Sequence, residues 1–179
     1  MALRPFDNVS LVVVDAQFDY VDVIVDDDRN KFILSAHKVL TAFRDAGQPV
    51  IHVRTSVRAD GSNAMPHRRD APLCIDGTRG ADVPEELRAL ENEKVVIKSH
   101  FSAFDNSEFE ARLRHREISK VVIIGAFTHA CVRETAIDAY RLGFDVVVVA
   151  DAVVSPDLQH AEATLAWLDG RVAELVDAA

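Results

Sequence analysis

The feature that most constrains the fold is an apolar run that passes through a glycine directly into a helical pattern carrying a cysteine. Residues 121–124 (VVII) are all β-branched, which is typical of a strand buried on both faces of a parallel sheet. We expect Gly125 to end this strand. Apolar residues then recur at helical spacing from Ala130 to Gly143, where a glycine can take the left-handed cap conformation.

This arrangement places Cys131 in the first turn of the predicted helix. Unpaired backbone N–H groups and the positive end of the helix dipole favour a thiolate at that position, so we expect a lowered pKa for the Cys131 thiol. An arbitrary cysteine is more often a small buried hydrophobic residue, but the position of Cys131 favours a nucleophile. Cys74 lies in an irregular region without a helix start, and we predict that it is not catalytic.

The composition is that of a globular protein with a single domain over residues 1–179, because 49% of the residues are hydrophobic and 27% are charged. The net charge of −9 is spread along the chain, which argues against nucleic acid and against an anionic membrane as partners. The two cysteines are far apart, and neither a signal-peptide pattern nor a membrane-spanning apolar run is present. We therefore expect a cytoplasmic protein with free thiols.

Short apolar runs alternate with amphipathic segments along the rest of the chain. Strands are expected at 11–15, 49–53, 95–98, 121–124 and 145–150, where Asp151 ends the fifth, with an edge strand at 171–176; helices are expected at 30–46, 84–90, 107–116, 130–143 and 158–168. This alternation predicts an α/β fold with three layers, α-β-α, around a doubly wound, mostly parallel sheet of five to six strands. The irregular segment 54–80 is long enough to be a functional loop.

Three of these strands deliver a reactive group to the same edge of the sheet. Asp15 follows the first strand, Lys98 ends the third, and Cys131 comes just after the fourth. Singly, an aspartate there is usually a turn or capping residue and a lysine is usually solvated. Ligands of such sheets bind outside the carboxyl ends of the strands, so the convergence predicts an acid–base and nucleophile set. Lys98 would stabilise a thiolate, while Asp15 accepts a proton and returns it to a leaving group.

A longer pattern surrounds these three residues. It consists of Asp15-Ala16-Gln17, residues 97–104 (IKSHFSAF), and residues 125–136 (GAFTHACVRETA) followed by Asp138-Ala139. In this order, over about residues 9–167, the segments resemble the isochorismatase-like cysteine hydrolases. That family includes nicotinamidases, N-carbamoylsarcosine amidase and ureidoacrylate-type amidohydrolases.

The resemblance implies a doubly wound sheet and a catalytic triad formed by Asp15, Lys98 and Cys131. It also implies a cis peptide bond between Ala126 and Phe127, so that the backbone N–H groups of Phe127 and Cys131 form an oxyanion hole. Relatives are often dimers or tetramers. We therefore expect a homodimer or homotetramer that acts on a small-molecule substrate.

The metal-binding branch of the family carries an aspartate and histidines just after the second strand. Thr55 and Val57 stand about where two of those ligands are expected, which argues against a metal in the catalytic site, and we expect no cofactor. Four histidines elsewhere lack the spacing of a recognisable zinc set: His52, His67, His100 and His129.

Several side chains near the predicted catalytic edge are candidates for binding the substrate. Aromatic rings, with Phe127 among them, can line a flat pocket, although ordinary core packing explains them equally well. The candidates are Gln17, Tyr20, Phe101, Phe104 and Thr128.

Three functions fit these observations. The leading one is hydrolysis of a linear C–N bond, amide or ureido, in a small molecule through a thioester on Cys131. The second is isochorismatase-type hydrolysis of a vinyl ether, in which Asp15 acts as the acid and no thiol is required. The third is a catalytically silent binding or assembly domain, because many functions share this architecture; the intact Asp15, Lys98 and Cys131 weigh against it.

Overall fold

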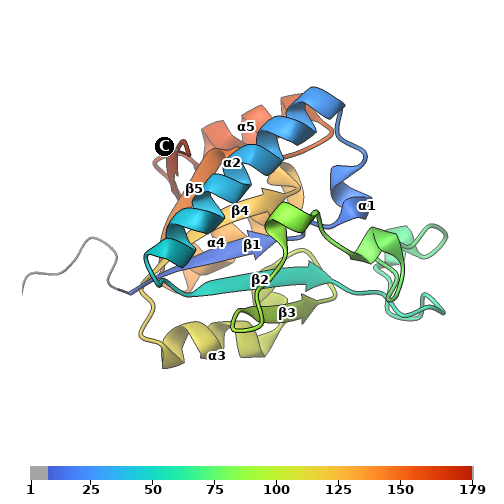
Figure 1. Ribbon diagram of the computed structural model, residues 1–179, viewed down its shortest axis with the longest axis horizontal. Helices are drawn as coiled ribbons and strands as arrows, with labels where there is room; N and C mark the ends of the chain where they lie inside the picture. Colours follow the sequence, from blue (N-terminus) through green and yellow to red (C-terminus); the bar gives the residue numbers. More distant parts are fainter. Residues whose placement is uncertain (1–7, 179) are drawn as a thin grey trace, which may run out of the picture.

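Six parallel strands form the middle layer of the computed structural model, which describes residues 8–178 (Figure 1). Their order in the sheet is β3-β2-β1-β4-β5-β6. The predicted doubly wound parallel sheet is therefore confirmed. The strands are β1 (Val9–Val14), β2 (Val50–Thr55), β3 (Lys94–Lys98), β4 (Lys120–Ala126), β5 (Asp145–Val154) and β6 (Glu174–Val176).

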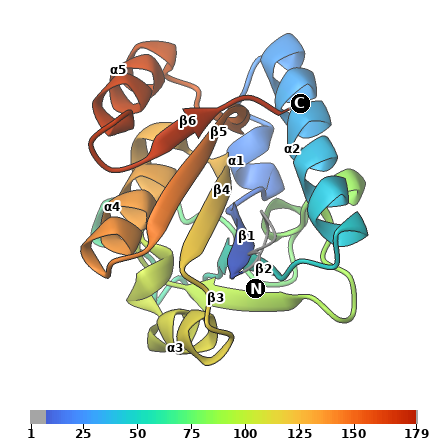
Figure 2. The same cartoon turned by 90° about the vertical axis from the view of Figure 1, so that its left-hand side faces the viewer.

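Helices cover both faces of this sheet (Figure 2). One face carries α1 (Phe18–Val21) and α2 (Asp26–Asp45), and the other carries α3 (Ser107–His115), α4 (Arg133–Arg141) and α5 (Leu158–Leu168). Successive strand residues point to opposite faces, so Ile123 packs against the second group of helices while Ile124 packs against the first. Among residues 8–178, no helix combines the length and apolar character needed to cross a membrane.

The strand order reverses between β1 and β4. From β1 the chain winds outward through β2 to β3, and it then returns to pair β4 with β1 before winding the other way through β5 to β6. Such a switch point leaves a crevice at the carboxyl ends of the two central strands. Asp15 follows one of these strands and Cys131 follows the other.

The expectation that Gly125 ends the fourth strand is wrong, because β4 continues through it to Ala126. The pairing of β4 with β5 shifts register between Ile123 and Gly125, and Gly125 has a φ of +128°. A Cβ atom there would lie 1.9 Å from the Val14 carbonyl oxygen. Glycine is therefore needed for β1 and β4 to approach each other at the switch point.

Other boundaries also differ from the sequence prediction. α2 starts at Asp26 rather than at residue 30, since three aspartates in its first turn interact favourably with the helix dipole before the apolar stripe begins. β5 runs past Asp151 to Val154 because its pairing with β4 resumes there. The helix expected at 84–90 is only a single 3-10 turn, η3 (Glu85–Leu87).

The long segment 54–80 is irregular, as predicted, and contains the 3-10 turns η1 (Pro66–Arg68) and the start of η2 (Arg79–Ala81). An isolated bridge between Val57 and Ile75 closes its base. Cys74 lies within it, fully buried, and its backbone N–H donates to Asp19 Oδ2 at 2.6 Å. The loop is thus packed onto the carboxyl end of the sheet.

Substitution of Gly125 by alanine tests the close approach of β1 and β4. We expect Gly125→Ala to lower the free energy of unfolding by roughly 2–5 kcal/mol, because the methyl group meets the Val14 carbonyl and the positive φ disfavours an L side chain. Chemical denaturation followed by circular dichroism measures this.

Gly143→Ala is the matched control, since Gly143 also has a positive φ but nothing lies within 4 Å of its added Cβ. Gly143→Ala should lower the free energy of unfolding by only about 1 kcal/mol. Equal losses for the two variants would contradict the steric explanation.

Candidate active site

Asp15 is held in the left-handed region at the end of β1, with a φ of +44°. Aspartate tolerates this conformation better than most residues. Its backbone N–H donates to the Val53 carbonyl at 2.8 Å, which continues the pairing with β2. The carboxylate is fully buried, and its Oδ1 accepts from Thr55 N at 2.8 Å and from Thr55 Oγ1 at 3.1 Å. The side chain is thus fixed at the switch point.

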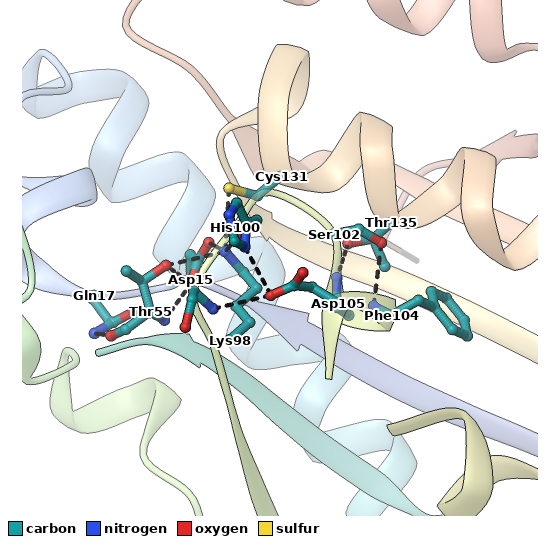
Figure 3. A network of polar contacts seen from close by, with 12 residues as sticks. Asp15, Gln17, Thr55, Lys98, His100, Ser102, Phe104, Asp105, Cys131 and Thr135 are labelled. Atoms are coloured by element: carbon teal, nitrogen blue, oxygen red, sulfur yellow. Dashed lines mark hydrogen bonds and ion pairs between the residues drawn. The ribbon is translucent and has the colours of Figure 1, made fainter. Parts of the chain in front are cut away.

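Lys98, the last residue of β3, lies against this carboxylate with its side chain excluded from water (Figure 3). Its Nζ is 2.6 Å from Asp15 Oδ2. The three N–H donors of the ammonium point to Thr55 Oγ1 at 3.0 Å, the His100 carbonyl at 2.8 Å and Cys131 Sγ at 3.5 Å. The contact with Oδ2 is therefore a tight ion pair, and no backbone N–H or hydroxyl among residues 8–178 donates to this oxygen.

The charge state of Lys98 follows from two opposing effects. Burial lowers the pKa of the ammonium, but the negative charges of Asp15 and of a Cys131 thiolate outweigh it, so the pKa is raised overall. Lys98 is thus an ammonium at neutral pH and places a fixed positive charge beside the sulfur.

Cys131 lies in a π-helical turn, η5 (Thr128–Val132), that links β4 to α4. Only 4% of the residue is exposed. The lowered thiol pKa expected from a helix start is not found: burial, and next the negative charge of Asp15, raise the pKa, and Lys98 only partly opposes them. Burial and the Asp15 charge therefore favour the thiol over the thiolate in the free protein.

The backbone between β4 and η5 presents Phe127 to the same space. The peptide bond between Ala126 and Phe127 is cis. The Phe127 carbonyl accepts from Ala130 N at 3.1 Å and from Val132 N at 3.2 Å, whereas its N–H makes no hydrogen bond within residues 8–178. This donor is available to a ligand.

A cavity of about 560 Å³ opens onto Cys131. Two of the predicted substrate-binding residues, Tyr20 and Phe101, line it together with Phe127. The Tyr20 and Phe127 rings meet edge to face at 5.2 Å, and Phe101 stacks on the His67 ring at 5.8 Å. Asp15 and Lys98 are not part of the lining, so a ligand reaches the network through the sulfur.

The other three predicted substrate-binding residues lie outside the lining. The Phe104 ring packs edge to face against Phe109 at 4.8 Å in the core beside α3. Gln17 is buried and donates from Nε2 to the carbonyls of Thr55 and Ala81 at 2.9 and 3.0 Å. Thr128 is buried in the π-helical turn. Core packing and backbone hydrogen bonds account for these side chains.

Sequence reasoning considered Thr55 only as a substitute for a metal ligand and missed its contacts with both Asp15 and Lys98. The signal available was its place at the end of β2, the strand that separates β1 from β3. Segment 54–80 also contributes apolar residues to the cavity: Val57, Ala64, Met65 and Leu73. Within residues 8–178, no group of three histidine, cysteine or acidic side chains is arranged to hold a metal ion.

Comparisons with known proteins identify the family of the chain. The family model for the isochorismatase domain matches residues 9–179. The chain is 31% identical to the secreted isochorismatase effector Isc1 of Verticillium dahliae over 156 residues, which cover 86% of this chain and 76% of that protein. It is 32% identical to the ureidoacrylate amidohydrolase RutB of Pseudomonas savastanoi pv. phaseolicola over 169 residues, covering 80% and 69%.

A solved structure supports the same assignment. The isochorismatase family protein from Desulfovibrio vulgaris superposes with a TM-score of 0.87 at 30% sequence identity, covering 96% of this chain and 94% of that one. The resemblance seen in the sequence is thereby confirmed, and the chain belongs to the isochorismatase family of hydrolases.

Proposed function

We propose that the protein hydrolyses a linear C–N bond, amide or ureido, in a small molecule, with Cys131 as the nucleophile. The observation that carries this proposal is the chain of buried contacts from Cys131 Sγ to Lys98 Nζ to Asp15 Oδ2, at 3.5 and 2.6 Å, at one wall of the cavity. Similarity to a protein named as a ureidoacrylate amidohydrolase supports the bond type.

The first half of the reaction is acylation. The thiol gives its proton to Asp15 Oδ2, the carboxylate oxygen that is paired with Lys98 and not bound by Thr55, as the sulfur attacks the substrate carbonyl and the S–C bond forms. Negative charge moves to the carbonyl oxygen, where the N–H groups of Phe127 and Cys131 stabilise it. Lys98 holds its positive charge next to both reacting groups.

The second half releases the two products. The C–N bond breaks as Asp15 returns its proton to the leaving nitrogen, and a thioester remains on Cys131. A water then attacks the thioester, with Asp15 accepting the water's proton and passing it to the departing sulfur. At the end of the cycle Cys131 is again a thiol and Asp15 is again a carboxylate, as in the resting protein.

A second candidate is isochorismatase-type hydrolysis of a vinyl ether. The similarity to a protein named as an isochorismatase effector favours it. In that reaction a protonated Asp15 delivers its proton to the enol-ether carbon, water adds to the resulting cation and returns a proton to Asp15, and the C–O bond of the hemiketal then breaks to give a ketone and an alcohol. The sulfur takes no part.

Two substitutions separate these candidates. If the sulfur is the nucleophile, Cys131→Ala should lower kcat by on the order of 10³ or more with the best amide substrate, and Asp15→Asn should be similarly inactive. Ammonia or amine release from a panel of amides and ureido compounds measures kcat. Intact mass spectrometry of the wild type with a slow substrate should detect an acyl adduct on Cys131.

The vinyl-ether reaction would instead be supported by two results together. A correctly folded Cys131→Ala protein would keep at least a tenth of the wild-type rate with the best substrate, and Asp15→Asn would be inactive. If neither wild type nor variants turn over any amide or vinyl ether, the catalytically silent reading gains support.

The charges around the sulfur predict that Asp15→Asn and Lys98→Met change the reactivity of the Cys131 thiol in opposite directions. Asp15→Asn removes a negative charge that raises the pKa of the Cys131 thiol, so iodoacetamide should label Cys131 at lower pH than in the wild type. Lys98→Met removes the compensating positive charge, so labelling should require higher pH. Alkylation rates across pH, followed by peptide mass spectrometry, measure both shifts.

Cys74 is the internal control, because it is fully buried and outside the cavity lining and should stay unlabelled in the folded protein. Shifts of the same sign in the two variants, or preferential labelling of Cys74, would contradict the electrostatic model of the site.

A further inference from the structure

Thr55 lies between Gln17 and Asp15 in the network of Figure 3. Its hydroxyl accepts from Lys98 Nζ at 3.0 Å and lies 3.1 Å from Asp15 Oδ1. A hydroxyl has only one hydrogen to donate. Because the ammonium can only donate and the carboxylate can only accept, the direction of the chain is fixed as Lys98 to Thr55 to Asp15.

The backbone of Thr55 is held by hydrogen bonds at both its N–H and its carbonyl. Its N–H lies 2.8 Å from Asp15 Oδ1 and 2.9 Å from Gln17 Oε1, and its carbonyl accepts from Gln17 Nε2 at 2.9 Å. Gln17 is 1% exposed, so these contacts are shielded from competing water. The buried Gln17 side chain therefore helps to hold the backbone of Thr55 in place, although Gln17 does not line the cavity.

These contacts make the two oxygens of Asp15 unequal. Oδ1 accepts two hydrogen bonds, both from Thr55, whereas Oδ2 faces the Lys98 ammonium at 2.6 Å and no backbone N–H or hydroxyl within residues 8–178. The Thr55 hydroxyl also accepts one N–H of the same ammonium. Thr55 thereby binds one carboxylate oxygen and leaves the other in contact with Lys98.

We infer that Thr55 is a positioning residue of the active site, which binds one oxygen of Asp15 and one hydrogen of Lys98 so that the other oxygen of Asp15, which is paired with Lys98, is the one that accepts the proton of Cys131. The expected effect of Thr55 on turnover rests on the proposed function. The expected effect of Thr55 on the Asp15–Lys98–Cys131 network is measured without a substrate.

Thr55→Val tests it, because valine keeps the β-branched shape and the backbone N–H and removes only the hydroxyl. We expect kcat for the best substrate to fall by about 10- to 100-fold with KM changed less than threefold, since valine keeps the shape of Thr55 in the cavity lining while proton transfer is impaired. Thr55→Ser, which restores the hydroxyl, should recover most of the rate.

Alkylation of Cys131 by iodoacetamide supplies the readout without substrate. The ionisable groups near the sulfur are Asp15 from the end of β1, Lys98 from β3 and Tyr20 from α1. The cavity beside it is also lined by His129 from η5 and by Arg133 and Glu134 from α4. In Thr55→Val the Asp15 carboxylate loses a hydrogen bond that disperses its negative charge, so it opposes a thiolate more strongly. Labelling at pH 8 should therefore slow severalfold and its pH profile should move upward, and Thr55→Ser should reverse both.

Thr135→Val is the matched control, because Thr135 is also buried and its hydroxyl accepts only from Ala103 N, at 3.0 Å. It should leave the alkylation profile in place. If Thr55→Val does not fold by circular dichroism, Thr55→Ala serves in its place with the same expectations.

The outcomes separate this inference from the proposed function. A wild-type alkylation profile in Thr55→Val, or a shift that Thr55→Ser fails to reverse, overturns the positioning role even if Cys131→Ala is inactive. An active Cys131→Ala protein overturns the thioester mechanism, while a shifted alkylation profile in Thr55→Val still supports the role of Thr55.

Discussion

A carboxylate and an ammonium, both excluded from water, lie 2.6 Å apart where β1 and β3 end. Removing two charges from water costs several kcal/mol for each ion, and their attraction offsets this only when the remaining polar groups are well bonded. Here the second strand supplies the Thr55 hydroxyl and N–H, and the segment after β3 supplies the His100 carbonyl. The Asp15–Lys98 pair therefore depends on the registry of three strands, and the chemistry at Cys131 depends on the pair.

The sulfur reaches this pair because of the way β4 lies against β1. Gly125 lets the two strands approach, and the chain then turns through Phe127 into the π-helical turn that carries Cys131. The resulting site joins a thiol of raised pKa to a carboxylate that binds Thr55 through one oxygen and Lys98 through the other. In the proposed reaction, the nucleophile is generated at the moment of attack rather than held as a standing thiolate. That matches an acid–base role for Asp15 and a fixed electrostatic role for Lys98.

The sheet and the convergence of three residues were predictable, because parallel strands share one carboxyl edge and Asp15, Lys98 and Cys131 follow strands with strong apolar patterns. The role of Thr55 was not, since it depends on the pairing of Thr55 with Lys98 across β2 and β3, which periodicity does not encode. The thiol pKa was misjudged because the helix-start argument is local, whereas burial and the charge of Asp15 come from tertiary structure. In the sequence, Gly125 can equally mark the end of a strand or a bulge within it. The contact with the Val14 carbonyl that decides between the two comes from tertiary structure.

The central position of β1 also has a consequence for how the chain is made. β1 precedes β4 in the chain, yet the two strands are neighbours in the sheet, with Val9 paired to Lys120. Until β4 has been synthesised, the strand VSLVVV exposes an unpaired and almost wholly apolar edge. A nascent chain halted after β3 would present that edge to other chains, and such edges promote aggregation. Synthesis therefore includes an interval in which this central strand lacks one of its two partners.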